Sequence, residues 1–355
     1  MKALVLAGGA GTRLRPFSHS TPKQLVPVAG KPVLFHVLET LARAGITETG
    51  VVVGGAAEQV RAAVGDGSRF GMDVSYLPQD APRGLAHAVL IARAFLADDD
   101  FVMFLGDNIF ADGIEEPLDR FRTGGAAAQL VVRKVADPSQ CGVAEIDAEG
   151  RVTALQEKPE RPRSDLAVTG VYFFTPRIHE AVRGIEPSRR GELEITDAVQ
   201  WLVSRGADVR AHLCSGYWAD TGTLGDLLEC NKVLLEGISP DNRGTVDAAS
   251  VLSGPVVVAA GARVTRSLIT GPAVIGARTV VEDSDIGPFT SIGEGCRLQG
   301  AGVENSILLD QVSVQGVRRI SGSIIGRAGD VRQTPDGSAV HRLLVGDDSR
   351  IDVPA

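Results

Sequence analysis

Small apolar residues recur at steps of six or nearly six positions after residue 245, and this repeat constrains the fold of the C-terminal third more than any other feature. Steps of six join Val258 to Val264 and Val314 to Ile320. Steps of six or five run through the series Ile275, Val281, Ile286, Ile292, Leu298 and Val303. A repeat of six is typical of a parallel β-helix, whose short strands stack an aliphatic interior coil upon coil. An irregular Gly/Val-rich sandwich is the alternative, but so many consecutive near-six steps favour a β-helix with bulged corners.

Up to about residue 235 the pattern is different, because short apolar runs alternate with helical stretches. The predicted strands are mostly β-branched and lie at Ala3–Leu6, Val51–Val53, Val74–Tyr76, Phe101–Leu105 and Gln129–Val132. The predicted helices include Val33–Ala44, Ala56–Val64 and Ala86–Phe95. This alternation argues for a parallel sheet with helices on both faces, whose ligands bind beyond the carboxyl ends of the strands.

The change of pattern divides the chain. We expect a first domain over residues 1–240 and a β-helix domain with a C-terminal tail over residues 241–355. The expected linker is Glu236–Thr245, which is rich in Gly, Pro, Asp and Asn.

Charge and cysteine content exclude several classes of protein. Thirty-six Lys and Arg against 44 Asp and Glu leave a formal net charge of −8, so a strongly basic nucleic-acid-binding surface is not expected. No apolar run approaches the roughly 18 residues of a membrane helix, and the opening run is too short for a signal peptide. Four widely spaced cysteines without a CxxC pair indicate reduced thiols. We therefore expect a cytoplasmic protein with neither nucleic acid nor membrane as a partner.

A glycine-rich loop, Leu6–Leu14, follows the first predicted strand and reads LAGGAGTRL. Glycines let the backbone approach a phosphate, and exposed amides there form an anion-binding nest. The spacing of a dinucleotide-binding loop fails, because counting from Gly9 its third small position is Leu14, and the Lys-Ser/Thr ending of a P-loop is missing. Arg13 ends the loop and Lys23 follows, so two cations are available to neutralise charge as pyrophosphate leaves a nucleoside triphosphate.

Two aspartates form a candidate metal site. Asp107 follows the predicted strand Phe101–Leu105, where ligands of a parallel sheet bind, and Asp220 lies in the motif YWADTG. Asp107 alone could simply cap the next turn. Two Asp residues from separate loops can hold one Mg²⁺ while phosphate oxygens complete its octahedron.

Eight motifs occur in order along the chain: LAGGAGTRLRP, PKQLVPVAGKP, PRGLAHAV, FLGDNIF, EKP, TGVYFF, RGELEITD and WADTG. Together they resemble the sugar-phosphate nucleotidyltransferases and, among these, the long form of the glucose-1-phosphate thymidylyltransferases. The resemblance implies an α/β fold: a Rossmann-like nucleotidyltransferase domain with a mostly parallel mixed sheet, followed by a left-handed parallel β-helix. It implies that dTTP and α-D-glucose 1-phosphate are the substrates, that dTDP-glucose and pyrophosphate are the products, and that Mg²⁺ is the cofactor.

The resemblance also implies roles for single residues. Nucleotide contacts are expected from Leu6, Gly8, Gly9, Gly11, Thr12, Gln24, Gln79, Gly84 and Leu85. Sugar-phosphate contacts are expected from Gly142, Glu157, Lys158, Val168, Arg190 and Glu192. The expected catalytic cations are Arg13, Lys23 and Lys158, and the expected metal ligands are Asp107 and Asp220.

Three further residues are interpreted with less help from the motifs. His87 is expected to pack on its helix, and Trp218 is either an aromatic wall or core. Cys141 departs from the family, which usually has an aromatic residue before Gly-Val. A nucleophilic role for Cys141 is rejected, because the sequence places no general base near it.

Other functions remain open at this point. The same chemistry could use UTP or another sugar 1-phosphate. An added acetyltransferase would usually need a histidine within the coils, and none lies between residues 245 and 330. A regulatory subunit without activity would be expected to lack a metal or phosphate residue, yet this chain has all of the expected metal and phosphate residues.

Because the open ends of a β-helix need covering, we expect the tail Thr334–Ala355 to cap one end and the chain to form a homo-oligomer.

Overall fold

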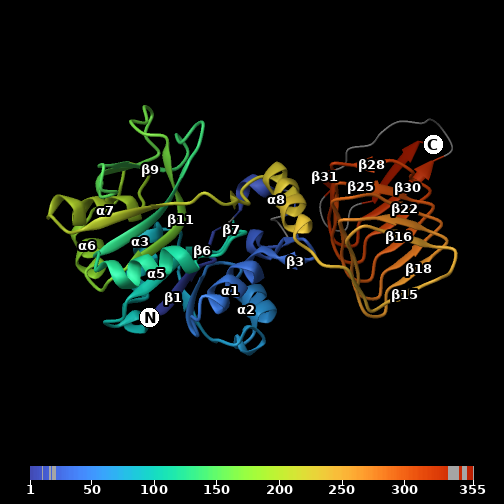
Figure 1. Cartoon of the computed structure of the whole chain (residues 1–355), viewed down its shortest axis with the longest axis horizontal. Coiled ribbons are helices and arrows are strands. Elements are labelled where there is room, and N and C mark those ends of the chain that lie inside the picture. The colour runs from blue at the N-terminus through green and yellow to red at the C-terminus, as the bar shows by residue number, and fades with distance from the viewer. Residues whose placement is uncertain (10, 16, 18–20, 335–343, 346–349, 355) are drawn as a thin grey trace. The chain divides into compact units, whose positions relative to one another are not determined.

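The computed structural model describes residues 1–9, 11–15, 17, 21–334, 344–345 and 350–354 (Figure 1). The chain forms two compact units, and each is described by itself. The first contains Met1–Ala10 and Leu34–Asp220, and the second contains Gly11–Val33 and Thr221–Ala355. The chain therefore passes from the first unit to the second within the glycine-rich loop. The domain boundary expected at residue 240 stays a prediction.

A mixed sheet forms the centre of the first unit. Its parallel part has β1 (Lys2–Leu6) between β4 (Glu48–Val53) and β6 (Phe101–Leu105), with β5 (Asp73–Pro78) beside β4. The antiparallel part continues from β6 to β11 (Leu166–Phe174), β9 (Gly142–Ile146) and β10 (Val152–Glu157). In addition, β8 (Ala128–Lys134) pairs with β11 and β12 (Val209–Leu213), and β7 (Asn108–Phe110) pairs with β13 (Trp218–Asp220).

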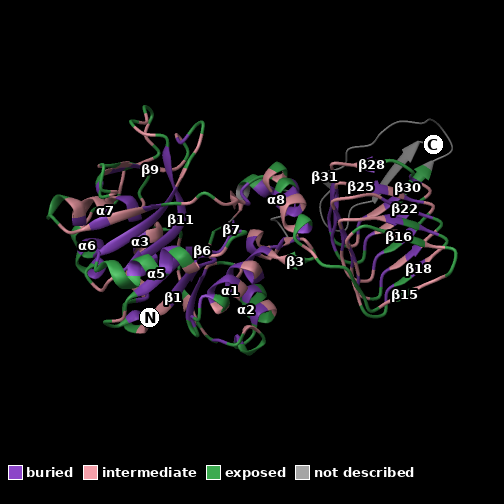
Figure 2. Cartoon of the chain, in the orientation of Figure 1, coloured by how far each residue is buried: buried purple, intermediate pink, exposed green. Residues whose placement is uncertain are grey.

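The central strands end at a common level. Leu6 lies opposite both Val52 and Leu105, so the loops after β1, β4 and β6 leave the same edge of the sheet. The predicted strands of this half lie within the observed ones. Their apolar runs are almost entirely buried in β1, β4, β6 and β8, whereas β5 is half-buried or exposed. Figure 2 shows β1 and β11 mostly in the colour of buried residues.

Helices cover the sheet of the first unit. Their bounds are α1 (Val33–Arg43), α2 (Ala57–Val64), α3 (Leu85–Ile91), α4 (Arg93–Leu96), α5 (Glu115–Gly124), α6 (Ile178–Gly184) and α7 (Ile195–Ser204). Apolar residues of α3, α6 and α7 belong to one buried cluster with the sheet strands. The single helix expected over Ala86–Phe95 was wrong in one respect, since it divides at Ala92, where ψ is −2°. No helix in the described part of the chain has the length and apolar character required to cross a bilayer.

Three parallel sheets make up most of the second unit and form the predicted β-helix. The first contains β14 (Asp241–Asn242), β17 (Val256–Val258), β20 (Ala273–Ile275), β23 (Thr290–Ile292), β26 (Ile307–Leu308), β29 (Ile324–Ile325) and β31 (Leu344–Val345). The second contains β15 (Thr245–Val246), β18 (Arg263–Thr265), β21 (Val280–Glu282), β24 (Arg297–Gln299), β27 (Ser313–Gln315), β30 (Asp330–Thr334) and β32 (Arg350–Pro354). The third contains β16 (Val251–Ser253), β19 (Leu268–Thr270), β22 (Asp285–Ile286), β25 (Gly302–Glu304) and β28 (Ile320–Ser321).

The aliphatic residues that carry the repeat of six are the interior of these coils. All of them are buried, from Val258 and Val264 through Val314 and Ile320. The expected linker Glu236–Thr245 was too long, because the first coil strand already begins at Asp241. Within the expected tail, β31 and β32 each extend a sheet by one strand, while residues 335–343, 346–349 and 355 lie outside the described part.

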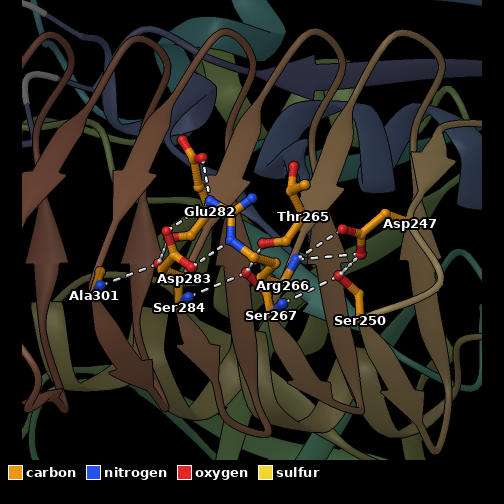
Figure 3. A network of polar contacts seen from close by, with 9 residues as sticks. All are labelled: Asp247, Ser250, Thr265, Arg266, Ser267, Glu282, Asp283, Ser284 and Ala301. Atoms are coloured by element: carbon orange, nitrogen blue, oxygen red, sulfur yellow. Dashed lines mark hydrogen bonds and ion pairs between the residues drawn. The ribbon is translucent and has the colours of Figure 1, made fainter.

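A ladder of hydroxyl groups holds one corner of the β-helix (Figure 3). Ser250 Oγ accepts from the amide of Ser267, Ser267 Oγ from the amide of Ser284, and Ser284 Oγ from the amide of Ala301. Each step of the ladder is 17 residues. On the outer side Arg266 donates from Nε and Nη2 to the carboxylate of Asp283, at 2.8 Å each. Three consecutive steps of the sequence repeat, two of six residues and one of five, thus make one coil of 17 residues.

The rest of the second unit consists of the segment Gly11–Val33 and one helix. The segment contains 3₁₀ turns at Thr12–Leu14 and Lys23–Leu25 and a hairpin of β2 (Pro27–Val28) and β3 (Lys31–Pro32). The helix α8 (Leu224–Glu236) begins with a capping box, in which Thr223 and Asp226 bond to each other's amides.

Candidate active site

Three neighbouring strands of the first unit are followed by glycines, which we call the glycine edge: Gly8 after β1, Gly54 after β4 and Gly106 after β6. A Cβ atom at Gly54 would lie 2.8 Å from the carbonyl oxygen of Gly8, and one at Gly106 would lie 2.9 Å from that of Leu6. Side chains are therefore excluded where these loops meet. The glycine edge presents main chain alone, which suits the approach of phosphate to backbone amides.

The predicted nucleotide residues Leu6, Gly8 and Gly9 lie at or beside this edge. Leu6 is buried at the end of β1, whereas Gly9 is exposed. The backbone, rather than the Leu6 side chain, is thus the part of this segment that a ligand can reach.

The next predicted residues lie in the second unit. Gly11 has φ of 61°, and its carbonyl accepts from the amide of Leu14 in the turn that begins at Thr12. Arg13 is exposed on this turn. A positive φ of this size explains why glycine stands at position 11.

Lys23 and Gln24 lie on the second 3₁₀ turn of this unit. Gln24 is 1% exposed, and its Oε1 has no hydrogen-bond partner among the described residues. A buried amide oxygen without a donor costs about 1–3 kcal/mol. A donor group on a nucleotide would remove that cost.

The predicted base-binding residue Gln79 follows β5 in the first unit. Its Nε2 lies 3.4 Å from the carbonyl oxygen of Gly84 and 3.1 Å from Nδ1 of His87. The other end of the amide faces the glycine edge, because a Cβ at Gly8 would lie 3.4 Å from Oε1. His87, expected only to pack on its helix, therefore also orients the Gln79 amide.

Gly84 and Leu85 are fixed by the backbone of Leu193. The amide of Leu193 donates to the carbonyl of Arg83 at 2.8 Å, and the amide of Ala86 donates to the carbonyl of Leu193 at 3.0 Å. Gly84 has φ of 98° and ψ of 169°, a region that essentially only glycine adopts. A Cβ there would lie 2.7 Å from the Leu193 nitrogen. The loop Gln79–Gly84, which we call the base loop, is thus joined to the segment that carries Glu192.

The predicted metal ligands are Asp107, which directly precedes β7, and Asp220, the last residue of the neighbouring strand β13. Asp220 is the antiparallel partner of Asn108, the residue after Asp107. The Asn108 side chain donates to Oδ1 of Asp107 at 3.0 Å, and its own Oδ1 accepts from the Trp218 indole at 2.7 Å. Trp218 thus orients Asn108 through its indole. No cluster of three or more His, Cys, Asp or Glu side chains able to hold a metal occurs among the residues that the structure describes.

Three of the predicted sugar-phosphate residues lie together, and we call them the sugar cluster: Gly142, Glu157 and Val168. A Cβ at Gly142 would lie 3.5 Å from Oε2 of Glu157 and 3.6 Å from Cγ2 of Val168. The hydroxyl of Thr196 donates to the same Oε2 at 3.2 Å. A carboxylate and an apolar side chain thus lie side by side at Gly142, where a Cβ would meet Cγ2 of Thr196 at 2.8 Å. Such a pair suits the hydroxyls and the ring of a sugar.

Two predicted cations flank Glu157. Lys158 Nζ lies 3.8 Å from Oε1 of Glu157, and Arg190 Nη2 lies 3.6 Å from the same atom. Arg190 also makes ion pairs with Glu192 at 3.1 Å and with the buried Glu194 at 2.9 Å. Lys158 has φ of 41°, and its amide donates to the carbonyl of Cys141 at 3.0 Å. The backbone beside the sugar cluster therefore sets the direction of Lys158.

Burial and neighbouring charges shift the pKa values of this site. Desolvation, with a further contribution from Glu194, raises the pKa of Glu157, while Lys158 and Arg190 oppose the shift. Desolvation and the charges of Asp220 and Glu157 raise the pKa of Cys141. A thiol held protonated is a poor nucleophile, which agrees with its exclusion from the chemistry.

Several supporting residues had not been singled out from the sequence. Asn108 holds Asp107, Thr196 and Glu194 hold Glu157 and Arg190, and Leu193 fixes Gly84. All four stand inside the motifs FLGDNIF and RGELEITD. The motifs marked the segments, but only the fold shows which member touches which.

The chain is similar to known proteins in sequence and in fold. The nucleotidyl transferase family matches residues 2–237. A glucose-1-phosphate thymidylyltransferase of Streptomyces antibioticus is 55% identical over 354 residues, which cover 99% of this chain and 99% of that relative. A solved Bacillus anthracis structure with sucrose, assigned as a glucose-1-phosphate thymidylyltransferase, is 35% identical with a TM-score of 0.63 and covers 68% of this chain and 98% of its own.

A second solved structure, a UDP-glucose pyrophosphorylase with UDP-glucose, is 25% identical with a TM-score of 0.60 and covers 66% of this chain and 98% of its own. The family match exceeds half of the chain, and the Streptomyces relative extends over nearly all of it. The chain therefore belongs to the nucleotidyl transferase family, among the glucose-1-phosphate thymidylyltransferases.

Proposed function

We propose that this chain transfers a thymidylyl group: dTTP and α-D-glucose 1-phosphate give dTDP-glucose and pyrophosphate. The observation that carries the proposal is the sugar cluster, where the Glu157 carboxylate lies beside Gly142 and Val168 and where Lys158 and Arg190 supply positive charge. The 55% identity to the Streptomyces enzyme over almost the full chain supports this choice of substrates.

Gln79 explains the preference for a pyrimidine of the thymine type. Because its Nε2 faces Gly84 and His87, its Oε1 is the atom available to the base. An amide oxygen accepts a hydrogen bond from the N3–H of thymine or uracil, but not from cytosine, whose N3 is an acceptor. Leu85 offers an apolar contact for the methyl group that distinguishes thymine from uracil.

The reaction requires little acid–base chemistry from the protein. An oxygen of the sugar phosphate attacks the α-phosphorus of dTTP, and the bond from that phosphorus to pyrophosphate breaks. The attacking monoester is already ionised near neutral pH, so no strong base is needed. In this proposal Lys158 and Arg190 hold the attacking phosphate beside Glu157, and Arg13 and Lys23 neutralise the charge that develops on pyrophosphate.

Asp107 and Asp220 fit a Mg²⁺ site. Carboxylates are the hard oxygen ligands that Mg²⁺ prefers, and the pairing of β7 with β13 places Asp220 opposite Asn108, the residue after Asp107. Two protein ligands suffice for this ion, since it usually keeps waters and substrate phosphates in its remaining positions. When bound, Mg²⁺ would neutralise phosphate charge at the reacting centre.

The test is a pyrophosphate-release assay over a matrix of nucleoside triphosphates and sugar 1-phosphates with Mg²⁺. We expect the highest kcat/KM with dTTP and glucose 1-phosphate. UTP, which shares N3–H, is the nearest competitor, and CTP should be poor. Preference for UTP or for another sugar 1-phosphate would replace the substrate assignment and keep the reaction class. Release with no pair would overturn the reaction class.

Replacement of Lys158 by Ala should chiefly weaken binding of the sugar phosphate. Loss of a charge-assisted contact costs about 1.5–3 kcal/mol, which raises the KM for glucose 1-phosphate by roughly 10- to 150-fold. The KM for dTTP should change little. Lys134→Ala, an exposed residue at the end of β8, is the matched control. An unchanged KM for glucose 1-phosphate in the Lys158→Ala enzyme would remove Lys158 from the phosphate site.

We also propose that the protein is a cytoplasmic homo-oligomer. The support for an oligomer is physical: the first and last coils of a β-helix expose strand edges without a paired neighbour, and a second copy of the chain can cover them. Light scattering at micromolar concentration checks this proposal, and a monomeric mass would contradict it.

A further inference from the structure

We propose that Asn231 is a positioning residue, which uses the β-helix to hold the segment carrying Lys23 and Gln24 in place. The inference rests on the proposed function for the roles of Lys23 and Gln24. It gives the β-helix a part in nucleotidyl transfer that none of the expected site residues supplies.

Asn231 is a buried residue of α8 that joins this helix to two distant parts of the second unit. Its Oδ1 accepts from the amide of Ala29 at 2.8 Å and from the hydroxyl of Ser291 at 2.7 Å. Its Nδ2 donates to the carbonyl of Phe289 at 2.9 Å. Asn231 is 1% exposed. Two donors meet its oxygen and an acceptor meets its nitrogen, so only one orientation of the amide satisfies all three partners.

The first partner lies in the tight turn of the hairpin β2–β3. Ala29 has φ of 47° and Gly30 has φ of 78°, as in the two-residue turns that match the twist of paired strands. Alanine is strained in this conformation, so the surroundings must hold it. Asn231 does this through the amide of Ala29. The same turn approaches a coil strand, because a Cβ at Gly30 would lie 3.0 Å from Cγ1 of Val274.

The second partner is a corner of the β-helix. Phe289 has φ of 60°, and its amide donates to the carbonyl of Pro272 in the preceding coil at 2.7 Å. The neighbour of Asn231, Lys232, has its ammonium 5.5 Å from the centre of the Phe289 ring. Helix α8 therefore holds this corner through two adjacent side chains.

The hairpin is directly continuous with the turn that carries Lys23 and Gln24. The amide of Val26 donates to the carbonyl of Lys23 at 3.3 Å, and the amide of Val33 donates to the carbonyl of Val26 at 3.1 Å. Val26 and Val28 are fully buried. At the other end of the segment, Arg327 donates to the hydroxyl of Thr21 at 3.4 Å. Both ends of residues 21–30 are thus fastened to α8 or to the coils.

Fixing this segment matters because of what it carries. Gln24 is buried with an amide oxygen that meets no donor among the described residues, so its position must be imposed by its neighbours. A displacement of about 1 Å in a group that neutralises transition-state charge can cost roughly 100-fold in rate. Loosening the hairpin should therefore lower kcat and leave the sugar-phosphate site intact.

The test compares two serine variants of the full-length chain. Ser291→Ala removes one donor to Asn231, whereas Ser284→Ala removes a buried hydroxyl whose bonds to Glu282 and Ala301 stay within the coils. Both should lower the melting temperature slightly. Only Ser291→Ala should lower kcat, by about 5- to 10-fold, with the KM for glucose 1-phosphate unchanged. Ser291→Thr, which keeps a hydroxyl, should restore most of the loss.

Hydrogen exchange supplies a readout that needs no turnover. In the free protein, Ser291→Ala and Asn231→Ala should speed amide exchange in residues 21–33, and Ser284→Ala should not. If Asn231→Ala fails to fold, Ser291→Ala still decides. Equal kcat and equal exchange in the two serine variants would overturn the positioning role. A wild-type enzyme that releases no pyrophosphate would instead overturn the proposed function, while the exchange data would still judge Asn231.

Discussion

Asp107→Asn and Asp220→Asn should each lower kcat by roughly 100- to 1,000-fold, the scale seen when one group that stabilises transition-state charge is removed. Each change replaces a carboxylate by a neutral amide of the same shape. Asp107 is buried beside Asn108, and Asp220 pairs with Asn108 through the strands β7 and β13, so the fold should tolerate both changes. The measurement is pyrophosphate release at saturating dTTP and glucose 1-phosphate over a series of Mg²⁺ concentrations.

Asp98→Asn is the matched control for this pair. Asp98 forms an exposed ion pair with Arg93, and such pairs contribute about 0–1 kcal/mol to stability. Its turnover should equal that of the wild type. Turnover near the wild-type level in either test variant at ordinary Mg²⁺ would exclude that residue as a ligand.

Gly84→Ala should weaken binding of both substrates, dTTP and glucose 1-phosphate. The backbone at Gly84 has φ of 98° and ψ of 169°, which costs a residue with a side chain about 1–3 kcal/mol. The new Cβ would fall on the backbone of Leu193, 2.7 Å from its nitrogen. Relief requires the base loop to move away from Leu193, and Gln79 Nε2 would lose its contact with the carbonyl of Gly84.

We therefore expect the KM for dTTP to rise at least about tenfold, with a smaller rise for glucose 1-phosphate because Leu193 adjoins Glu192 and Glu194. The melting temperature should also fall. Gly55→Ala is the control, since a Cβ there meets nothing within 4 Å. Wild-type values of both KM and melting temperature in Gly84→Ala would show that Leu193 yields without consequence.

The parallel half of the sheet was predictable because it consists of short apolar runs, which are buried in β1, β4 and β6. Phe101–Leu105 matches β6 residue for residue, and Ala3–Leu6 lies within β1. The antiparallel strands were harder to place. In β11 the chain carries Gly170 at φ of 82°, and its register with β8 shifts between Val168 and Tyr172. An irregular strand of this kind has no simple repeat to read.

The β-helix was predictable because, unlike β11, it has a regular sequence repeat: its interior aliphatic residues recur in every coil. The same repeat shows neither where the first coil begins nor what packs beside it. Asn231 is one of the residues that join residues 11–33 to the coils, and its partners Ala29 and Ser291 are 202 and 60 residues away in sequence. Contacts at such separations leave no local pattern.

In the candidate site, too, the local sequence motifs were predictable and the contacts between distant residues were not. The motifs marked Glu157, Arg190 and Asp107, but they did not show that Thr196, Glu194 and Asn108 hold them. The short polar side chains of Thr196 and Asn108 look like ordinary helix-start and turn residues in the sequence. Their roles follow from strands and helices that meet only after folding.

The ladder of hydroxyl groups at Ser250, Ser267 and Ser284 limits how this part of the chain can change in length. Its hydroxyls occur every 17 residues, and each bonds to the amide at the start of the next step. Removal or duplication of one such step would leave every remaining hydroxyl facing an amide and every interior residue facing inward. The strands alone do not impose this length, because Arg297 pairs in register with Ser313 after only 16 residues. The hydroxyl ladder, rather than the strand pairing, therefore favours gain or loss of a whole coil of 17 residues at this corner.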